Sequence, residues 1–249
     1  MDAAVTHVER VDLRVVDVGA AQAFYRDVAG LEAGEEGVLR APGGRTLLGL
    51  SSEGVRGPAP ARATGLFHTA IRFPTRTALA AALRRVLAAG ARLSGASDHG
   101  VSEALYLDDP AGNGVELYWD RPREVWPTEM FTAPLDLRDL HAAGGETERA
   151  PEGTDVGHVH LKVADLERAV GFYVGELGLA VEHRYGSEAA FVAAGGYHHH
   201  VGLNMWLSRG AAPTPQELAG VERVVFGGRG PAQLRDPDGV AVAVEPIPG

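Results

Sequence analysis

The sequence predicts an α+β fold assembled from related strand–helix units, and two internal repeats support this prediction. The segment Val11–Ala33 matches Val159–Val181 without a gap, including a shared Phe-Tyr pair and the Gly-Leu that follows it. A second segment, Asp108–Trp119, matches Arg235–Pro246 around an Asp-Pro-x-Gly sequence. Because a long internal match marks a duplicated structural unit, the chain is expected to consist of repeated modules.

Each copy of the first repeat is expected to form a strand followed by a helix. In Val159–Val163 apolar and polar residues alternate, which is the period of a half-buried strand. Asp165 stands at the N-cap position of a segment with apolar residues at helical spacing, and Gly178 ends that segment. The Asp-Pro-x-Gly sequence of the second repeat predicts a turn between two strands.

Four units follow from these repeats. They cover about residues 7–51, 65–119, 157–206 and 221–245. Unit two is expected to contain a strand with Phe67 and Ile71 on its apolar face, followed by a helix, whereas unit four is too short to contain a helix. The domain prediction places units one and two in residues 1–120, a linker with a short helix in 121–155, and units three and four in 156–249.

Composition and charge narrow the function. The 249 residues are 45% apolar and 22% charged, carry a formal net charge of −10, and include no cysteine. An acidic chain of this kind is not expected to bind nucleic acid or an anionic membrane, and no apolar run is long enough to span a membrane. The N-terminal residues lack the pattern of a secretion signal, so a cytoplasmic location is expected. Without cysteine, a metal would be held by histidine and carboxylate.

Two segments carry a resemblance to a known family. SDHGVSEALYLDDPAGNGVELYWDRP (residues 97–122) and GGYHHHVGLNMW (residues 195–206), together with the modular pattern, resemble the vicinal oxygen chelate superfamily. Within it they are similar to extradiol ring-cleaving dioxygenases of the bacterial catechol 2,3-dioxygenase type. The resemblance implies four βαβββ modules, the fourth truncated, that form two half-open barrels, with modules two and three building the active one around a divalent metal.

Three candidate metal ligands fall on the polar faces of predicted strands. His68 lies on the mixed face of its strand in unit two, Glu116 on the polar face of the last strand of that unit, and His158 on the polar face of the first strand of unit three. Two imidazoles and one carboxylate that leave coordination positions open are typical of non-haem Fe(II) oxygenases. The resemblance implies metal ligands at these same strand positions.

The pairing of the units decides whether this site is complete. If units two and three share a barrel, the three candidates form one complete site and the other barrel has none. If units one and two pair instead, Arg10 stands at the position of His158, with Asp12 as a substitute ligand. If units three and four pair, Ala243 replaces the carboxylate, with Glu245 as its substitute. The first arrangement is favoured because it alone gives a full set of ligands.

Further candidates lie in the two segments that carry the resemblance. The run Tyr197-His198-His199-His200 is unusual, and strand alternation favours His200 as the cavity residue, with His199 as the alternative one position away. The resemblance implies that this histidine takes the substrate proton and later delivers it. It also implies that Tyr106 hydrogen-bonds a substrate oxygen and that His99 steadies bound oxygen. The Asp-Pro-x-Gly residues are interpreted as turn formers only.

The expected function is extradiol cleavage of a catechol-like ring. The resemblance implies Fe²⁺ as the metal, with Mn²⁺ as the alternative, and a small aromatic diol and O₂ as substrates. A homodimer is expected because a partner subunit would cover the barrel shortened by the missing helix. Two alternatives stay open. One is another metal-dependent reaction on this scaffold, of the glyoxalase or isomerase type, and the other is a metal-free small-molecule binding or resistance protein.

Overall fold

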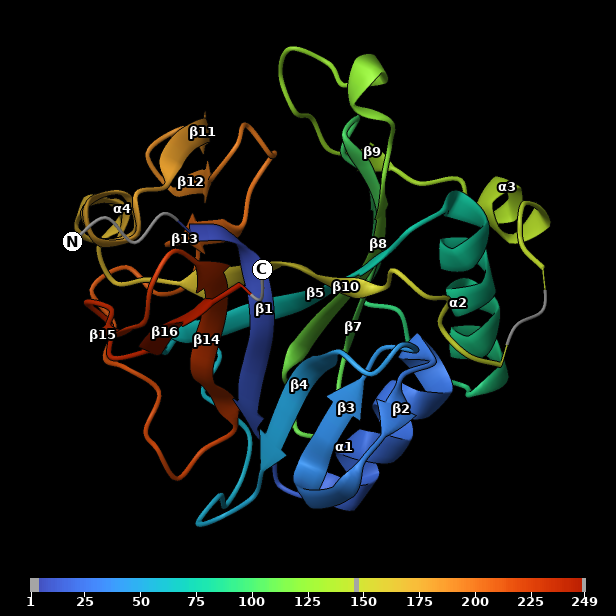
Figure 1. Ribbon diagram of the computed structural model, residues 1–249, viewed down its shortest axis with the longest axis horizontal. Helices are drawn as coiled ribbons and strands as arrows, with labels where there is room; N and C mark the ends of the chain where they lie inside the picture. The colour runs from blue at the N-terminus through green and yellow to red at the C-terminus, as the bar shows by residue number, and fades with distance from the viewer. Residues whose placement is uncertain (1–4, 146–147, 248–249) are drawn as a thin grey trace.

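Two curled sheets form the framework of the protein (Figure 1). The computed structural model describes residues 5–145 and 148–247. Strands from the beginning and the end of the chain form a seven-stranded sheet, and strands from the middle form a nine-stranded sheet. The α+β class predicted from the sequence is confirmed. None of the helices in the described residues is long and apolar enough to cross a membrane.

The seven-stranded sheet combines modules one and four. Its strand order is β15-β16-β14-β1-β4-β3-β2, and β1 pairs antiparallel with β14. No helix lies between β14 and β15, as expected for the shortened unit four. The strands are β1 (Val5–Arg14), β2 (Glu32–Ala33), β3 (Val38–Arg40), β4 (Thr46–Ser51), β14 (Gly220–Gly228), β15 (Ala232–Arg235) and β16 (Ala241–Pro246).

The nine-stranded sheet combines modules two and three. Its strand order is β11-β12-β13-β10-β5-β8-β7-β6-β9, and β10 of module three pairs antiparallel with β5 of module two. The pairing of modules two and three, favoured from the sequence, is thereby confirmed. The strands are β5 (Gly65–Phe73), β6 (Gly95–Asp98), β7 (Ser102–Asp108), β8 (Gly114–Asp120), β9 (Ala133–Pro134), β10 (Asp155–Lys162), β11 (Ala180–Tyr185), β12 (Ala189–Ala193) and β13 (Val201–Asn204).

Helices follow the first strands of modules one to three. The side chain of Asp165 accepts a hydrogen bond from the Arg168 N–H at the start of α4, and Gly178 ends α4 in the left-handed conformation at φ 71°. Both residues act as the sequence predicted. The helices are α1 (Val18–Phe24), which continues as a π-helical turn (Tyr25–Ala29), α2 (Arg76–Ala88), α3 (Leu137–Ala142) and α4 (Leu166–Leu177), with 3-10 turns at Glu35–Gly37 and Arg123–Val125.

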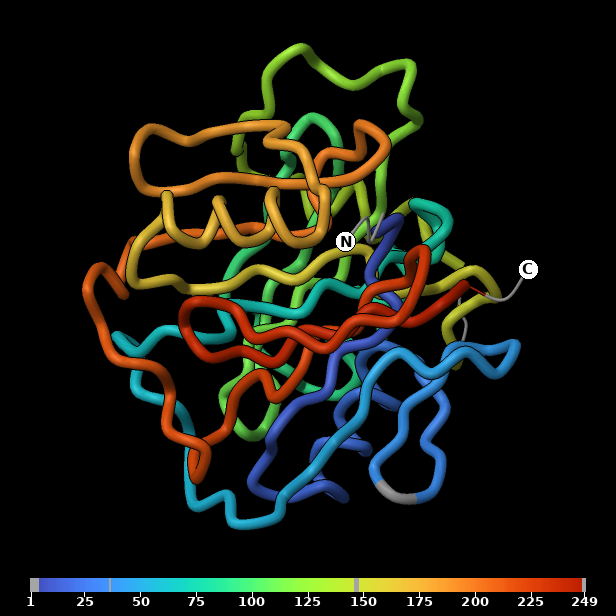
Figure 2. The backbone as a smooth tube through the Cα atoms, turned by 60° about the vertical axis from the view of Figure 1, so that its left-hand side comes forward, coloured from blue at the N-terminus to red at the C-terminus, as the bar shows by residue number. Residues whose placement is uncertain are grey.

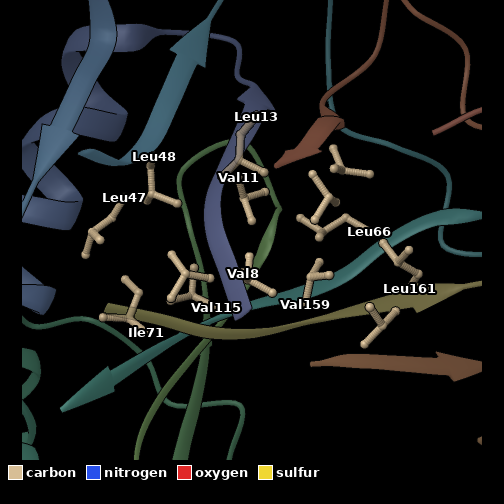
Figure 3. Close-up of a cluster of buried hydrophobic side chains, with 14 of the residues drawn as sticks. Val8, Val11, Leu13, Leu47, Leu48, Leu66, Ile71, Val115, Val159 and Leu161 are labelled. Atoms are coloured by element: carbon tan, nitrogen blue, oxygen red, sulfur yellow. The ribbon is translucent and has the colours of Figure 1, made fainter. Parts of the chain in front are cut away.

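One apolar core joins the two sheets. Val8, Val11 and Leu13 of β1 face Leu66 of β5 and Val159 of β10, and all five side chains are buried (Figure 3). The polar faces of β5 and β10 therefore turn away from the seven-stranded sheet. Beyond β8, the segment that leads to β9 projects from the rest of the molecule (Figures 1 and 2) and reaches one side of the opening on that polar face.

Candidate metal centre

Three adjacent strands bring the predicted ligands together. His158 of β10 pairs with Ala70 of β5, and Ala70 pairs in turn with Glu116 of β8. His68 lies two residues before Ala70 on the same strand and therefore on the same face. Because the central position of this row is an alanine, the two flanking side chains can approach each other across it.

The three ligand atoms converge on one point. Nε2 of His158 is 3.0 Å from Oε2 of Glu116 and hydrogen-bonded to it. Nε2 of His68 is 2.9 Å from the same oxygen, yet this buried nitrogen has no partner with hydrogen-bond geometry among the described residues. One ligand atom from each residue lies within 4.8 Å of the others. A buried imidazole nitrogen that points at a shared carboxylate without a proper hydrogen bond fits a metal ligand, so these residues fit a divalent ion.

The electrostatics of the cluster favour the ligand forms of Glu116 and His158. Burial alone would raise the pKa of Glu116, but the imidazoles of His158 and His68 hold it well below its usual range. Burial lowers the pKa of His158 to about 4. Since metal binding requires an ionised carboxylate and neutral imidazoles, Glu116 and His158 are already in the forms that bind a cation.

A cavity of about 400 Å³ opens directly onto the cluster. His68 and Glu116 form part of its wall, and no lysine or arginine is among the described residues that line it. Six of the 13 remaining lining residues are aromatic. The aromatic lining residues are Phe67, Tyr106, Phe131, Tyr185, Phe191 and Trp206.

Tyr106 and His99 both lie in this cavity wall as a hydrogen-bonded pair. Nε2 of His99 is 2.8 Å from the hydroxyl of Tyr106, and Tyr106 pairs with Glu116 across β7 and β8. Burial and the nearby carboxylate of Glu116 raise the pKa of Tyr106 well above its usual value. The phenol therefore stays protonated and presents a polar group next to the cluster.

The histidine run is placed differently from the favoured expectation. His199, not His200, lines the cavity, and its ring lies 4.0 Å from that of His158. His200 packs beside Tyr197, and its Nδ1 accepts a hydrogen bond from the Ala194 N–H. The expectation for His200 assumed strand alternation, but β13 begins only at Val201, so residues 197–200 do not obey the two-residue period.

Several cavity residues were not identified from the sequence, and Phe67 and His160 lie next to the cluster. Phe67 was expected on the face opposite His68, yet both side chains line the cavity. The reason is a bulge in β5: His68 pairs with His160 and Leu66 with Leu161, which leaves Phe67 as the extra residue. Nothing in the alternating pattern indicates this bulge.

His160 is another cavity residue that sequence reasoning missed. It follows His158 by two positions, so the alternation already placed both on one face, and this signal could have identified it. Its Nε2 is buried without a hydrogen-bond partner among the described residues. Its ring lies on Gly202 of β13, where an added Cβ would come within 2.8 Å of the imidazole carbons. His160 therefore forms part of the cavity wall, and a glycine opposite makes room for it.

The seven-stranded sheet has no equivalent cluster in the residues that the structure describes. Arg10 pairs with Val225 and Val225 with Ala243, the same register that joins His158, Ala70 and Glu116. Arg223 takes the position of His68. Asp12 lies between the two arginines, 2.8 Å from Arg10 and 3.1 Å from Arg223, so ion-paired guanidinium groups stand where the other sheet has imidazoles.

Comparisons with known proteins agree with this architecture. The family model described as the glyoxalase/bleomycin resistance protein/dioxygenase superfamily matches residues 5–117. A Bacillus subtilis (strain 168) protein named catechol-2,3-dioxygenase is 39% identical over 231 residues, which cover 87% of this chain and 81% of the relative.

Solved structures show the same fold at low sequence identity. A proposed dioxygenase from Bacillus subtilis superposes with a TM-score of 0.64 at 12% identity, covering 99% of this chain and 87% of the other. Glyoxalase I from Zea mays superposes with a TM-score of 0.58 at 16% identity, covering 96% of this chain and 91% of the other. These structures have dioxygenase and glyoxalase names, so the fold alone leaves the reaction open.

Proposed function

Since the chain belongs to the glyoxalase/bleomycin resistance protein/dioxygenase superfamily, as an extradiol dioxygenase-like member, we propose that it opens catechol-type rings with O₂. The convergence of His68, Glu116 and His158 at the wall of an aromatic cavity carries this proposal. The identity to a relative named catechol-2,3-dioxygenase supports ring cleavage over a glyoxalase-type reaction.

The overall reaction is balanced without any further reagent. One O₂ and one catechol are consumed, the ring carbon–carbon bond beside one hydroxyl breaks, and both oxygen atoms enter the ring-opened product as part of a carboxyl and an aldehyde group. A divalent metal held by the three ligands supplies, when bound, coordination positions for the two vicinal oxygens and for O₂. We propose Fe²⁺ as this metal, with Mn²⁺ as the alternative that the same ligand set accepts.

The cavity residues orient the substrate and move its proton. His199 lies close enough to the cluster to receive the proton of a substrate hydroxyl and to return it to the product. The hydroxyl of Tyr106, next to Glu116 and supported by His99, is available to hydrogen-bond a substrate oxygen. The aromatic wall keeps water away from the ring.

The wall of the cavity also favours one class of substrate. Because the part of the cavity wall that the structure describes contains no lysine or arginine, a carboxylate on the ring would be desolvated without a basic side chain to balance it. Phe67, Phe191 and Trp206 instead offer apolar surface to an alkyl or aryl substituent, and about 400 Å³ gives room for one. We therefore propose uncharged catechols with an apolar substituent as substrates.

The test combines metal analysis with product formation. Protein loaded with Fe²⁺ under anaerobic conditions is expected to bind about one ion per chain. It should then consume equal amounts of O₂ and 4-methylcatechol, with the appearance of a yellow ring-opened product. On 3,4-dihydroxybenzoate, kcat/KM should be lower by about tenfold or more. Loading with Mn²⁺ in parallel distinguishes the two metals.

The variant Glu116→Gln serves as the control, because it keeps the shape of the side chain and removes its charge. It should lose both the metal and the activity. Metal binding without O₂ consumption on any catechol would contradict ring cleavage and favour a glyoxalase-type reaction. Absence of metal from the wild-type protein would contradict the centre itself and favour a binding protein.

A further inference from the structure

His199 is connected through His198 to a buried carboxylate. Nδ1 of His199 is 2.7 Å from Nδ1 of His198, and Nε2 of His198 is 2.8 Å from Oδ1 of Asp120. Both histidines are buried, with 6% of His199 and 5% of His198 exposed. Asp120 is the last residue of β8 and follows Glu116 by four positions. The strand that carries the candidate ligand Glu116 therefore also carries the carboxylate that ends this row of hydrogen bonds.

The other oxygen of Asp120 has separate partners. Oδ2 accepts a hydrogen bond of 2.8 Å from the hydroxyl of Tyr197 and one of 3.1 Å from Nη1 of Arg72. Oδ1 bonds to His198, so the carboxylate is held in place on one side and directed at the imidazole on the other. Burial alone would raise the pKa of Asp120, but the hydrogen bond and the charge of His198, followed by the charge of Arg72, hold it below its usual range.

The ionised carboxylate determines the direction of the hydrogen bond from His198, and the neutral form of His198 determines the direction of the next one. A carboxylate only accepts, so Nε2–H of His198 donates to Asp120. A neutral His198 then has an unprotonated Nδ1, which can only accept, so Nδ1–H of His199 donates to it. Nε2 of His199 is left with its lone pair. Among the described residues Nε2 has no hydrogen-bond partner, and the ring borders the cavity.

We propose that Asp120 and His198 are positioning residues that hold His199 in its Nδ1–H tautomer, so that Nε2 faces the cavity as the acceptor for a substrate proton. This inference rests on the proposed function. In the step itself the substrate O–H bond breaks, its electron pair stays on oxygen, and an N–H bond forms at Nε2 of His199. The charge that then appears on His199, beside His158, is compensated by Asp120 through His198.

The tautomer can be measured without any reaction. Nitrogen-15 NMR of histidine-labelled full-length protein, without metal and with diamagnetic Zn²⁺, distinguishes protonated from unprotonated ring nitrogens. The signals of His199 are identified by their loss in His199→Gln. Protonation at Nδ1 near pH 7.5 is expected, and protonation at Nε2 would overturn the proposal. Because this measurement needs no turnover, it tests the tautomer independently of ring cleavage. Ring cleavage itself is tested by the activity of the wild-type protein.

Kinetics test the consequence of the tautomer. Asp120→Asn keeps the shape of the side chain and removes the charge, and His198→Phe keeps the ring and removes both nitrogens. In both variants kcat should fall by about tenfold to a hundredfold, while KM and metal content stay at wild-type values. The matched control is His200→Asn, which retains an acceptor for the Ala194 N–H in the same histidine run. Wild-type kcat in both Asp120→Asn and His198→Phe would overturn the inference, as would a loss of metal that accounts for the loss of activity.

Discussion

The hydroxyl of Tyr173 donates a hydrogen bond of 3.1 Å to Oδ2 of Asp236, and this bond ties the two sheets together. Tyr173 belongs to α4, which packs on the nine-stranded sheet, whereas Asp236 starts the turn before β16 of the seven-stranded sheet. Oδ1 of Asp236 accepts the N–H groups of Asp238 and Val240 within that turn. The repeated pair, Tyr25 with Asp109, makes the equivalent connection at 3.4 Å.

The burial of Asp236 predicts a specific pH dependence of stability. Burial raises the pKa of Asp236 to about 6, against about 3.9 for an unfolded aspartate. At pH values between these two pKa values, the folded protein binds more protons than the unfolded chain. The contribution of Asp236 to the free energy of unfolding is therefore fully present below about pH 4 and decreases as the pH rises through 6, by about 3 kcal/mol in total.

Asp236→Asn removes this titration. The stability of the variant relative to wild type should therefore rise between pH 4 and pH 7, as measured by urea unfolding at each pH. Asp108→Asn, at an exposed aspartate next to the equivalent turn, is the control and should keep a constant difference from wild type. A difference between Asp236→Asn and wild type that does not change with pH would contradict the prediction.

Metal binding should depend on each of the three converging residues. His68→Ala and His158→Ala each remove one imidazole from a buried cluster, so metal content is expected to fall from about one ion per chain to nearly none. Elemental analysis after loading and gel filtration measures this. His200→Asn, in which the changed histidine lies outside the cavity, should retain the wild-type metal content. Equal metal content in all these variants would show that the ligands lie elsewhere.

His199 should matter for turnover but not for the metal. His199→Gln keeps a polar side chain of similar length and removes the proton acceptor, so kcat is expected to fall by about 10²- to 10⁴-fold. Steady-state kinetics together with metal analysis would check this. If the variant kept wild-type kcat, the proton would have to leave through another group, and His160 would be the candidate, because its buried Nε2 has no hydrogen-bond partner among the described residues.

Gly202 should be needed for the shape of the cavity. In Gly202→Ala the new Cβ would come within 2.8 Å of the His160 ring and push it toward the substrate. We expect a loss of about 1 to 3 kcal/mol in the free energy of unfolding and a severalfold increase in KM. Gly171→Ala is the control, because it places a Cβ in open space within α4 and should be neutral or stabilising. Similar behaviour of the two variants in thermal unfolding and kinetics would refute the close packing of His160.

The repeats and the strand periods determined much of this protein without any structure. The gapless match between the modules located Tyr25 and Tyr173 on equivalent helices, and alternation placed His68, Glu116 and His158 on polar strand faces. Such features can be read from the sequence because each depends on neighbours along the chain, whose side-chain directions follow from the local backbone period. The Asp-Pro-x-Gly turns were identified for the same reason.

Contacts between distant segments were decided by the tertiary structure alone. The bulge at Phe67 arises from the pairing of β5 with β10, which the sequence of either strand does not contain. The choice of His199 over His200 depends on where β13 begins, and the bond from His198 to Asp120 joins residues far apart in the chain. The sequence by itself determined which residues could form a metal centre. Tertiary packing decided that His199 lines the cavity and that His198 and Asp120 are hydrogen-bonded behind it, because those positions depend on several strands at once.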